Sequence, residues 1–297
     1  MATVRVLCSR MRVEEKQIAQ ALAESGSVLE PVVPAAMPIP PMPTPPAPAA
    51  SGELASTLVI DRVQTRSVGS VTVQALRSAG TITIDAGLAA TGDRLQVASA
   101  LAAAGVARPE TVLAVNDAAA MEAVAGFGYP ATLLPLAYDG APVTLLDVDT
   151  AEAVIEHRLV LGTGMERISL VQRGSGIGAV LVIVVDGTAV AIVDGEASAV
   201  NASAVTMAER AAVALNADVI GVRVAHIDGT AVVWDVEAVP EFRHAVRLGE
   251  IGVGEAIAAL ALSLGKHGGV SAQLTHRGAR TSGSAAREGQ HGVVLTA

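Results

Sequence analysis

The stretch Trp234–Arg247, which reads WDVEAVPEFRHAVR, is the segment from which the fold can be argued. It continues an apolar run, Ala231–Trp234, that is typical of a buried strand. Asp235 and Glu237 follow two residues apart, so in an extended backbone both side chains point from the same face. Two carboxylates at the end of an apolar strand suit a hard divalent cation that also binds phosphate oxygens. The alternative is an edge strand with a solvated acidic face.

The same stretch resembles the metal-binding strand and following turn of RimK-type ATP-grasp ligases. It is most similar to the LysX branch, in which the run has the form N-E-V-N-H-T-M-E-F-K-N. Asp235 stands where that family has a metal-binding Glu, and Glu237 where it has a metal-binding Asn. Glu241, Phe242 and Arg243 follow the E-F-K part. The resemblance therefore implies ATP and Mg as cofactors, with Asp235 and Glu237 as the metal ligands.

Further segments resemble the LysX branch in the same order along residues 3 to 264. SRMRVEEK at Ser9–Lys16 is similar to S-R-x-R-x-E-E-K, and TGDR at Thr91–Arg94 is similar to C-G-D-K. FGYPATLLPL at Phe127–Leu136 is similar to F-G-Y-P-V-V-L-K-P-V, and AEAVIEHRL at Ala151–Leu159 to A-E-A-L-L-E-H-K. The resemblance implies an α/β (α+β) ATP-grasp fold.

The implied domains follow the family order. An N-terminal pre-ATP-grasp domain with a parallel sheet covers residues 1–87, and a small central subdomain covers 88–165. A C-terminal subdomain with a mixed sheet covers 166–265. The proline-rich run 31–50 cannot form a helix or a central strand, so we expect a loop between elements. Residues 266–297 are rich in Gly, Ser, Arg and His, and we expect a disordered tail.

Several charged groups of the family are replaced in this chain. Arg94 occupies the position of the lysine in C-G-D-K, which reaches ATP phosphate, and exchanges an ammonium for a planar fork. Leu134 occupies the position of the main ATP-binding lysine. Arg223 occupies that of the aspartate that binds the second metal. An arginine facing Asp235 and Glu237 is expected to form an ion pair rather than share a cation with them.

The resemblance also implies the other site residues. Gln172 and Arg173 lie at the segment that pairs with adenine, where the family has I-Q-E-Y-V, and join Arg94 as predicted nucleotide contacts. No catalytic residue is assigned. The predicted contacts to substrate or carrier are Arg10, Arg12, Asn201, Arg243 and Arg247. The run RGSGIG at Arg173–Gly178 could cradle phosphate, although alternate glycines alone are weak evidence.

Composition limits the classes of partner. The formal net charge is -9 and no basic run occurs, which argues against nucleic acid. The longest apolar runs are too short to span a bilayer, and no secretion signal is recognisable, so we expect a soluble protein. The single cysteine, Cys8, excludes a disulfide framework and fits a cytoplasmic location.

Three functions remain open. LysX-type enzymes use MgATP to activate the C-terminal glutamate of a small acidic carrier protein, LysW, and then join an amino acid to it through an amide. The replaced charges favour a pseudo-ligase that acts as a binding or regulatory partner of such a carrier or of an active paralogue. The retained carboxylates favour a divergent active carboxylate–amine ligase in amino-acid biosynthesis. The third function is a nucleotide-independent small-molecule binding module. Whether the chain forms the family's homo-oligomer stays open.

Overall fold

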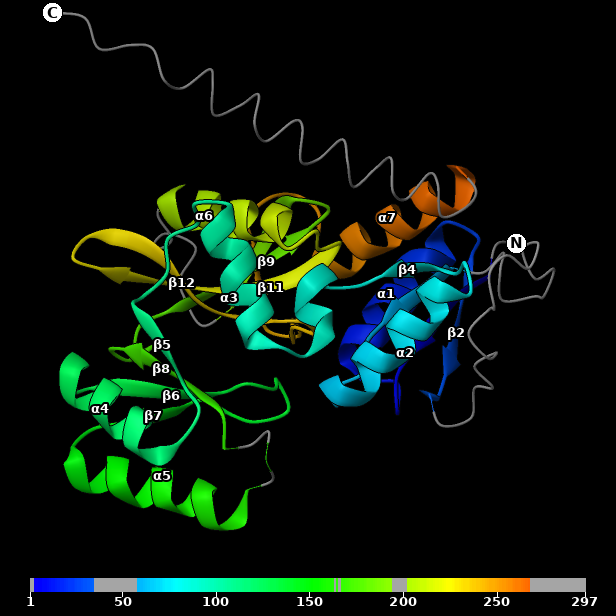
Figure 1. Cartoon of the computed structure of the whole chain (residues 1–297). Coiled ribbons are helices and arrows are strands. Elements are labelled where there is room, and N and C mark those ends of the chain that lie inside the picture. Colours follow the sequence, from blue (N-terminus) through cyan, green and yellow to red (C-terminus); the bar gives the residue numbers. More distant parts are fainter. Residues whose placement is uncertain (1–2, 35–57, 163, 165–166, 194–201, 268–297) are drawn as a thin grey trace, which may run out of the picture.

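The computed structural model describes residues 3–34, 58–162, 164, 167–193 and 202–267. This part of the chain forms three sheets, each covered by its own helices (Figure 1). One sheet is parallel and the other two are antiparallel. The predicted α/β class is therefore confirmed.

The N-terminal sheet has the order β2-β1-β3-β4, and its strands are parallel. Helices α1 and α2 pack on its two faces, α1 beside Val6 and α2 beside Leu7. Pro31 lies in β2, which is an edge strand and can therefore tolerate a residue without an N–H. Residues 35–50 of the proline-rich run lie outside the described residues. The elements are β1 (Thr3–Leu7), α1 (Val13–Glu24), β2 (Val28–Val32), β3 (Leu58–Asp61), α2 (Arg66–Ser78) and β4 (Ile82–Ile84).

The second sheet has the order β12-β11-β9-β10-β13. Strands β9 and β10 form a hairpin that turns at Asp186 and Gly187, whose φ angles are 52° and 77°. Its elements are β9 (Val180–Val185), β10 (Thr188–Val193), β11 (Val219–Ile227), β12 (Thr230–Glu237) and β13 (Val246–Arg247). One face is covered by η2 (Gly87–Thr91), α3 (Arg94–Ala103) and α6 (Ala202–Ala214).

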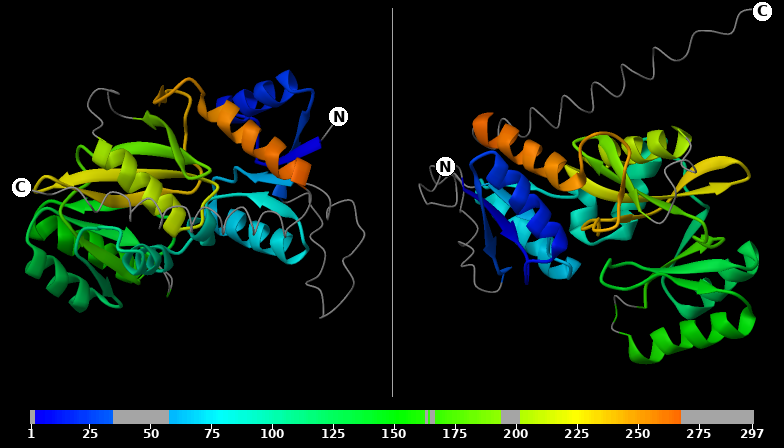
Figure 2. Two further views of the ribbon diagram at one scale, coloured as in Figure 1. Left: turned by 90° about the horizontal axis from the view of Figure 1, so that it is seen from above. Right: turned by 180° about the vertical axis from the view of Figure 1, so that it is seen from behind.

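Helix α7 (Val253–His267) covers the other face of this sheet and packs against α1, as the two views in Figure 2 show. Its apolar residues share a core with the N-terminal sheet and with Ile183 and Val185 of β9. The C-terminal helix therefore joins the first sheet to the second.

The third sheet has the order β5-β8-β6-β7 and carries both of its helices on one face (Figure 1). Its elements are β5 (Thr111–Ala114), α4 (Asp117–Phe127), β6 (Ala131–Pro135), β7 (Val143–Leu145), α5 (Val148–Leu161) and β8 (Ser169–Arg173). The face without helices is turned toward β12 of the second sheet, to which Gln172 is hydrogen-bonded.

The helices and strands that pack together around one sheet are not always consecutive in the sequence. Strand β8 follows the predicted boundary at residue 166 but pairs with β5 and β6 of the third sheet. Helix α3 follows the predicted boundary at residue 88 but packs in the core of the second sheet. The predicted tail lies outside the described residues from 268 on. In the described part of the chain, no helix has the length and apolarity needed to cross a membrane.

Candidate functional site

A cleft of about 640 Å³ lies between the third sheet and β12. Gln64 and Arg66, which follow β3 of the N-terminal sheet, line one side of it. Asp235 and Glu237 both line it, as the alternation along the strand predicts. The pairing of β11 with β12 shifts in register between Arg223 and Val224, so one residue of β12, Trp234, is left over. Trp234 consequently also lines the cleft, beside Asp235.

Asp235 is held by Arg94. The Arg94 Nε and Nη2 atoms lie 3.4 and 3.3 Å from the two carboxylate oxygens. The third nitrogen, Nη1, donates to the carbonyl oxygens of Pro135, Ala137 and Gly140 at 2.9, 2.8 and 3.3 Å. The Arg94 side chain is only 5% exposed. Every guanidinium nitrogen of the predicted phosphate ligand is thus bonded within the chain.

Glu237 is held by Arg223, which lies on the neighbouring strand β11. The Arg223 Nε donates to a Glu237 oxygen at 2.8 Å. The expected ion pair is therefore found, but Arg223 bonds Glu237 while Asp235 is bonded by Arg94. This second pair is more open, since the two side chains are 35% and 31% exposed.

These contacts determine whether Asp235 and Glu237 are available to bind a divalent cation. Each carboxylate of the predicted metal pair already has a guanidinium as its counter-ion. Among the residues that the structure describes, no group of three or more His, Cys, Asp or Glu side chains could hold a metal ion. With the side chains as they stand, a divalent cation on either carboxylate would have to displace the arginine that is bonded to it.

The loop between β6 and β7 is tied to two other parts of the chain. The Asp139 carboxylate accepts hydrogen bonds from the backbone N–H groups of Arg66 and Ser67, with 2.9 Å for Ser67, at the start of α2. Burial alone would raise the pKa of Asp139, but the hydrogen bonds from Ser67 and Arg66 hold it below its ordinary value. The Tyr138 ring lies under Arg94, with 4.2 Å between the guanidinium carbon and the ring centroid. An anion-binding helix end is thus occupied by the chain's own Asp139.

Strand β6 carries an apolar residue at the position where the family has its main ATP-binding lysine. Leu134 is fully buried in β6. Thr132, two residues before it on the same face, lines the cleft and donates to the Gly174 carbonyl at 2.8 Å. No cationic side chain is supplied from this strand.

Gln172 and Arg173, the predicted nucleotide contacts of β8, do not line this cleft. Gln172 is fully buried, and its amide nitrogen donates to the Trp234 carbonyl at 3.2 Å, which joins the two sheets. Arg173 is half-exposed and forms an ion pair with Glu110 at 2.9 Å. The structure therefore places only Arg94 of the three predicted nucleotide contacts in the cleft.

The glycines of the run RGSGIG lie against Trp234. A Cβ atom on Gly176 would stand 2.6 Å from the indole nitrogen and 2.9 Å from Cδ1, far inside contact distance. A Cβ on Gly174, whose φ is +88°, would touch the far edge of the same ring. The close approach of Trp234 thus accounts for two of the three glycines without any phosphate.

No protein-family model matches the chain. Solved structures do. The crystal structure of a RimK domain ATP-grasp protein from Sphaerobacter thermophilus is 28% identical, with a TM-score of 0.70, over 88% of this chain and all of that one. The chain has the ATP-grasp fold. The ATP-grasp ligase PsnB, in a complex with minimal precursor, Mg and ADP, matches with a TM-score of 0.60 and 15% identity over 89% of this chain and 98% of its own.

A third match is the D-alanine–D-alanine ligase from Bacillus anthracis, complexed with ATP. It is 11% identical with a TM-score of 0.56, over 80% of this chain and 86% of that one. Two of these three neighbours are ligases, and their structures are complexes with ADP and with ATP. In this chain, the cleft that Asp235 and Glu237 line also lies between two sheets of the ATP-grasp fold.

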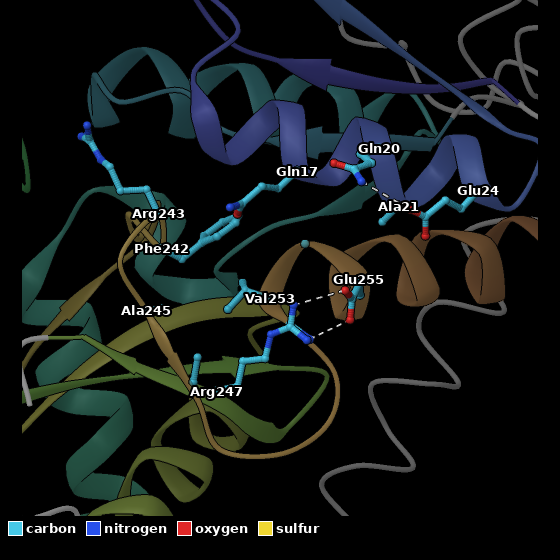
Figure 3. A pocket seen from close by; sticks show the side chains of 13 residues that line it. Gln17, Gln20, Ala21, Glu24, Phe242, Arg243, Ala245, Arg247, Val253 and Glu255 are labelled. Atoms are coloured by element: carbon cyan, nitrogen blue, oxygen red, sulfur yellow. Dashed lines mark hydrogen bonds and ion pairs between the residues drawn. The ribbon is translucent and has the colours of Figure 1, made fainter. Parts of the chain in front are cut away.

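The arginines predicted to contact substrate or carrier lie away from Asp235 and Glu237. Arg243 and Arg247 line a second cavity of about 330 Å³ between α1 and α7 (Figure 3). Arg247 is 3.5 Å from Glu255, and Arg243 is 3.1 Å from Glu241. Arg10 is exposed, and Asn201 lies outside the described residues.

Arg12 belongs to a buried network that sequence reasoning did not find. The Glu15 carboxylate is fully buried and accepts from Arg12 at 2.9 Å and from Arg62 at 3.0 Å. Arg62 is 2% exposed, donates to the Pro240 carbonyl at 3.0 Å and lies over the Phe242 ring. Burial alone would raise the pKa of Glu15, but Arg12 and Arg62 hold it below its ordinary value. This network joins the motif SRMRVEEK to the segment that follows β12.

Proposed function

We propose that this ATP-grasp-fold chain is a pseudo-ligase, which binds a partner and does not carry out efficient phosphoryl transfer. The observation that carries the proposal is that Arg94 and Arg223 already neutralise Asp235 and Glu237. Phosphoryl transfer depends on positioned cations that neutralise the charge of the transferred phosphate. Removing a group that stabilises developing charge commonly lowers the rate by about 10²–10³-fold.

The cost of releasing Asp235 supports the proposal. A metal ion on Asp235 would have to displace the buried Arg94, whose charge would then lose its only carboxylate partner among the described residues. Breaking a buried pair by removing one partner costs about 3–5 kcal/mol, because the remaining charge stays uncompensated. MgATP binding would have to offset this cost before any chemistry began.

The proposed partner is an active paralogue rather than an acidic carrier protein. A carrier of that kind would need an uncompensated basic surface, and the chain as a whole carries a net charge of -9. Arg12, Arg243 and Arg247 are each in an ion pair with a glutamate of the chain itself. Carrier binding that is lost on reversing the charges of Arg243 and Arg247 would restore the carrier as the partner.

The deciding experiment is a thermal melt with and without MgATP, combined with an assay of ATP consumption. An active LysX-type ligase serves as the positive control. Saturating ligand at a hundred times its dissociation constant stabilises a protein by about 2.7 kcal/mol, which is a rise of several degrees. We expect no magnesium-dependent rise and no ATP consumption. A clear rise with turnover would refute the pseudo-ligase proposal.

The second candidate is a divergent active ligase of the ATP-grasp type. It is favoured by the pair between Arg223 and Glu237, which is open enough for a cation to displace the arginine. In that case ATP consumption depends on Glu237, and Glu237→Gln abolishes it. The matched change Glu110→Gln, in an exposed ion pair outside the cleft, leaves it unchanged.

A further inference from the structure

Helices α2 and α3, together with η2 between them, carry a surface without exposed charges. From residue 62 to residue 106, every exposed residue is Val, Leu, Ala, Gly, Ser, Thr or Gln. The charged side chains in this range are buried or half-buried, namely Arg62, Arg66, Arg77, Asp85, Asp93 and Arg94. Helices α1, α4, α5 and α7, by contrast, expose charged residues such as Lys16, Glu122, Glu152 and Glu255. We call the exposed residues of α2, η2 and α3 the uncharged face.

The uncharged face is continuous across two of the three sheets. Helix α2 packs on the N-terminal sheet and α3 on the second sheet, and η2 contacts both helices. In Figure 1 these three elements lie on the side that faces the viewer. Four large apolar residues are exposed along them: Val68 and Val71 on α2, Leu88 on η2 and Leu95 on α3. Exposed apolar residues that gather on one surface in this way mark an interaction site.

The absence of charge limits what the uncharged face can bind. An acidic protein or a nucleic acid would need exposed cations, and a membrane surface would need basic and aromatic side chains. The face exposes neither kind of residue. The cores of protein–protein interfaces, however, are depleted of charged residues. The chemistry of the face therefore fits another protein surface without charges.

A second copy of the chain presents such a surface. Two copies that each carry a net charge of -9 repel one another, so a charged contact surface would oppose their association. A two-fold axis brings the same surface of both copies together, and a charge near the axis would face its own counterpart. The uncharged face is the part of α2, η2 and α3 where this repulsion is smallest.

We propose that the uncharged face is the docking surface for a second copy of this chain, related to the first by a two-fold axis. Helices α2 and α3 have 13 and 10 residues. With a rise of 1.5 Å per residue and a width of about 10 Å, they cover roughly 350 Å². A stable interface buries about 800 Å² per partner, so the dimer is expected to be reversible.

The inference goes beyond the proposed function, because it concerns a surface outside the cleft and requires no nucleotide. The two sites are nevertheless neighbours. Arg66 and Arg94, the first residues of α2 and α3, both line the cleft. A second copy on the uncharged face consequently stands beside the cleft.

Sedimentation velocity of the full chain, from low to high micromolar concentration, tests the dimer. We expect the mass to rise with concentration from the 29.8 kDa of the monomer toward twice that value. Sodium chloride should strengthen the association, because it screens the repulsion between the two acidic copies. A dimer held by ion pairs would instead weaken as salt is added.

Val71→Glu and Leu95→Glu test the surface, one on each helix. Val71 is 64% exposed, so a carboxylate there stays in water in the monomer and the fold is retained. The matched control is Val160→Glu on α5, where the valine is 67% exposed. We expect each of the first two variants to weaken dimerisation by about tenfold or more, because like charges then face one another. The control should associate as the wild type does, and all three variants should keep the wild-type melting temperature.

Three outcomes would overturn the inference. The first is a wild type that stays monomeric at every concentration. The second is a dimer that Val71→Glu or Leu95→Glu leaves as tight as the wild type, which would place the contact elsewhere. The third is a dimer that dissociates as salt is added. None of these results depends on ATP turnover, so a failure here is distinguishable from a failure of the pseudo-ligase proposal.

Discussion

Two arginine–carboxylate clusters in this ATP-grasp fold use the same residue types in different surroundings. At the junction between α1 and the segment after β12, Glu15 and Arg62 are almost fully buried, with an oxygen–nitrogen distance of 3.0 Å. In the cleft, the distance between Arg94 and Asp235 is 3.3 Å, and the pair of Arg223 with Glu237 is about one-third exposed. The first cluster is closed to water, whereas the second forms the wall of an open cleft.

The comparison separates structural from binding roles. At the junction, Glu15 accepts from two arginines, and Arg62 also has a carbonyl and an aromatic ring as partners. Next to β12, by contrast, the Nε atom of Arg108 is buried without a hydrogen-bond partner in the described part of the chain. Buried polar groups that are fully satisfied make a structure rigid, while those left unsatisfied need an explanation. We therefore expect the junction to control stability and the cleft to control binding.

The largest expected effect is that of Arg62→Ala. The change leaves Glu15 buried with Arg12 as its remaining partner, and it removes the contact with Phe242. Loss of one member of a buried pair should lower the free energy of unfolding by about 3–5 kcal/mol. Urea denaturation followed by circular dichroism measures it. Arg5→Ala, in an exposed pair, is the control and should cost less than about 1 kcal/mol. Equal losses in the two variants would show that the buried network at the junction contributes no more to stability than an exposed ion pair.

Gly176→Ala is expected to have the next largest effect. The new methyl group would stand 2.6 Å from the Trp234 indole nitrogen, so either the ring or the loop must move. Forcing an extra methyl into a packed site costs about 1–3 kcal/mol. The Trp234 emission maximum should shift at the same time. Gly178→Ala has no neighbour within 4 Å, but its φ of +79° adds backbone strain, so emission rather than stability separates the two variants. An unshifted spectrum in Gly176→Ala would contradict the packing.

The contacts in the two clusters also show which parts of the site could be predicted from the sequence and which could not. Alternation along the strand predicts that Asp235 and Glu237 share a face, and the neighbouring strand predicts an arginine opposite them. The contact between Arg94 and Asp235 joins residues 141 apart, and that between Asp139 and Arg66 joins residues 73 apart. No local pattern encodes such contacts. The bulge that turns Trp234 into the cleft likewise depends on the register with β11.

Asp139→Ala should have an intermediate effect. The change removes the acceptor at the start of α2, and the loss of such a cap costs about 1 kcal/mol. Because the pKa of Asp139 in the folded protein lies below its ordinary value of 3.8, the contribution is complete above that pH and is lost as the pH falls through the folded value. The difference in unfolding free energy between wild type and variant should therefore shrink below pH 3.8. If the difference in unfolding free energy does not change with pH, the effect comes from lost packing and not from the charge of the carboxylate.

The smallest stability effect is expected for Arg223→Gln, which leaves Glu237 exposed to solvent rather than stranded in a core. Partly exposed ion pairs contribute about 0–1 kcal/mol, so the melting temperature should hardly change. A titration with Mn²⁺, followed by its paramagnetic resonance signal, then asks whether Glu237 binds metal in the absence of the Arg223 guanidinium. We expect no tight site, because Asp235 stays bonded to Arg94. Metal binding in this variant alone would show that Arg223 by itself excludes the cation, and it would place the cleft one substitution away from the metal-binding state of an active ligase.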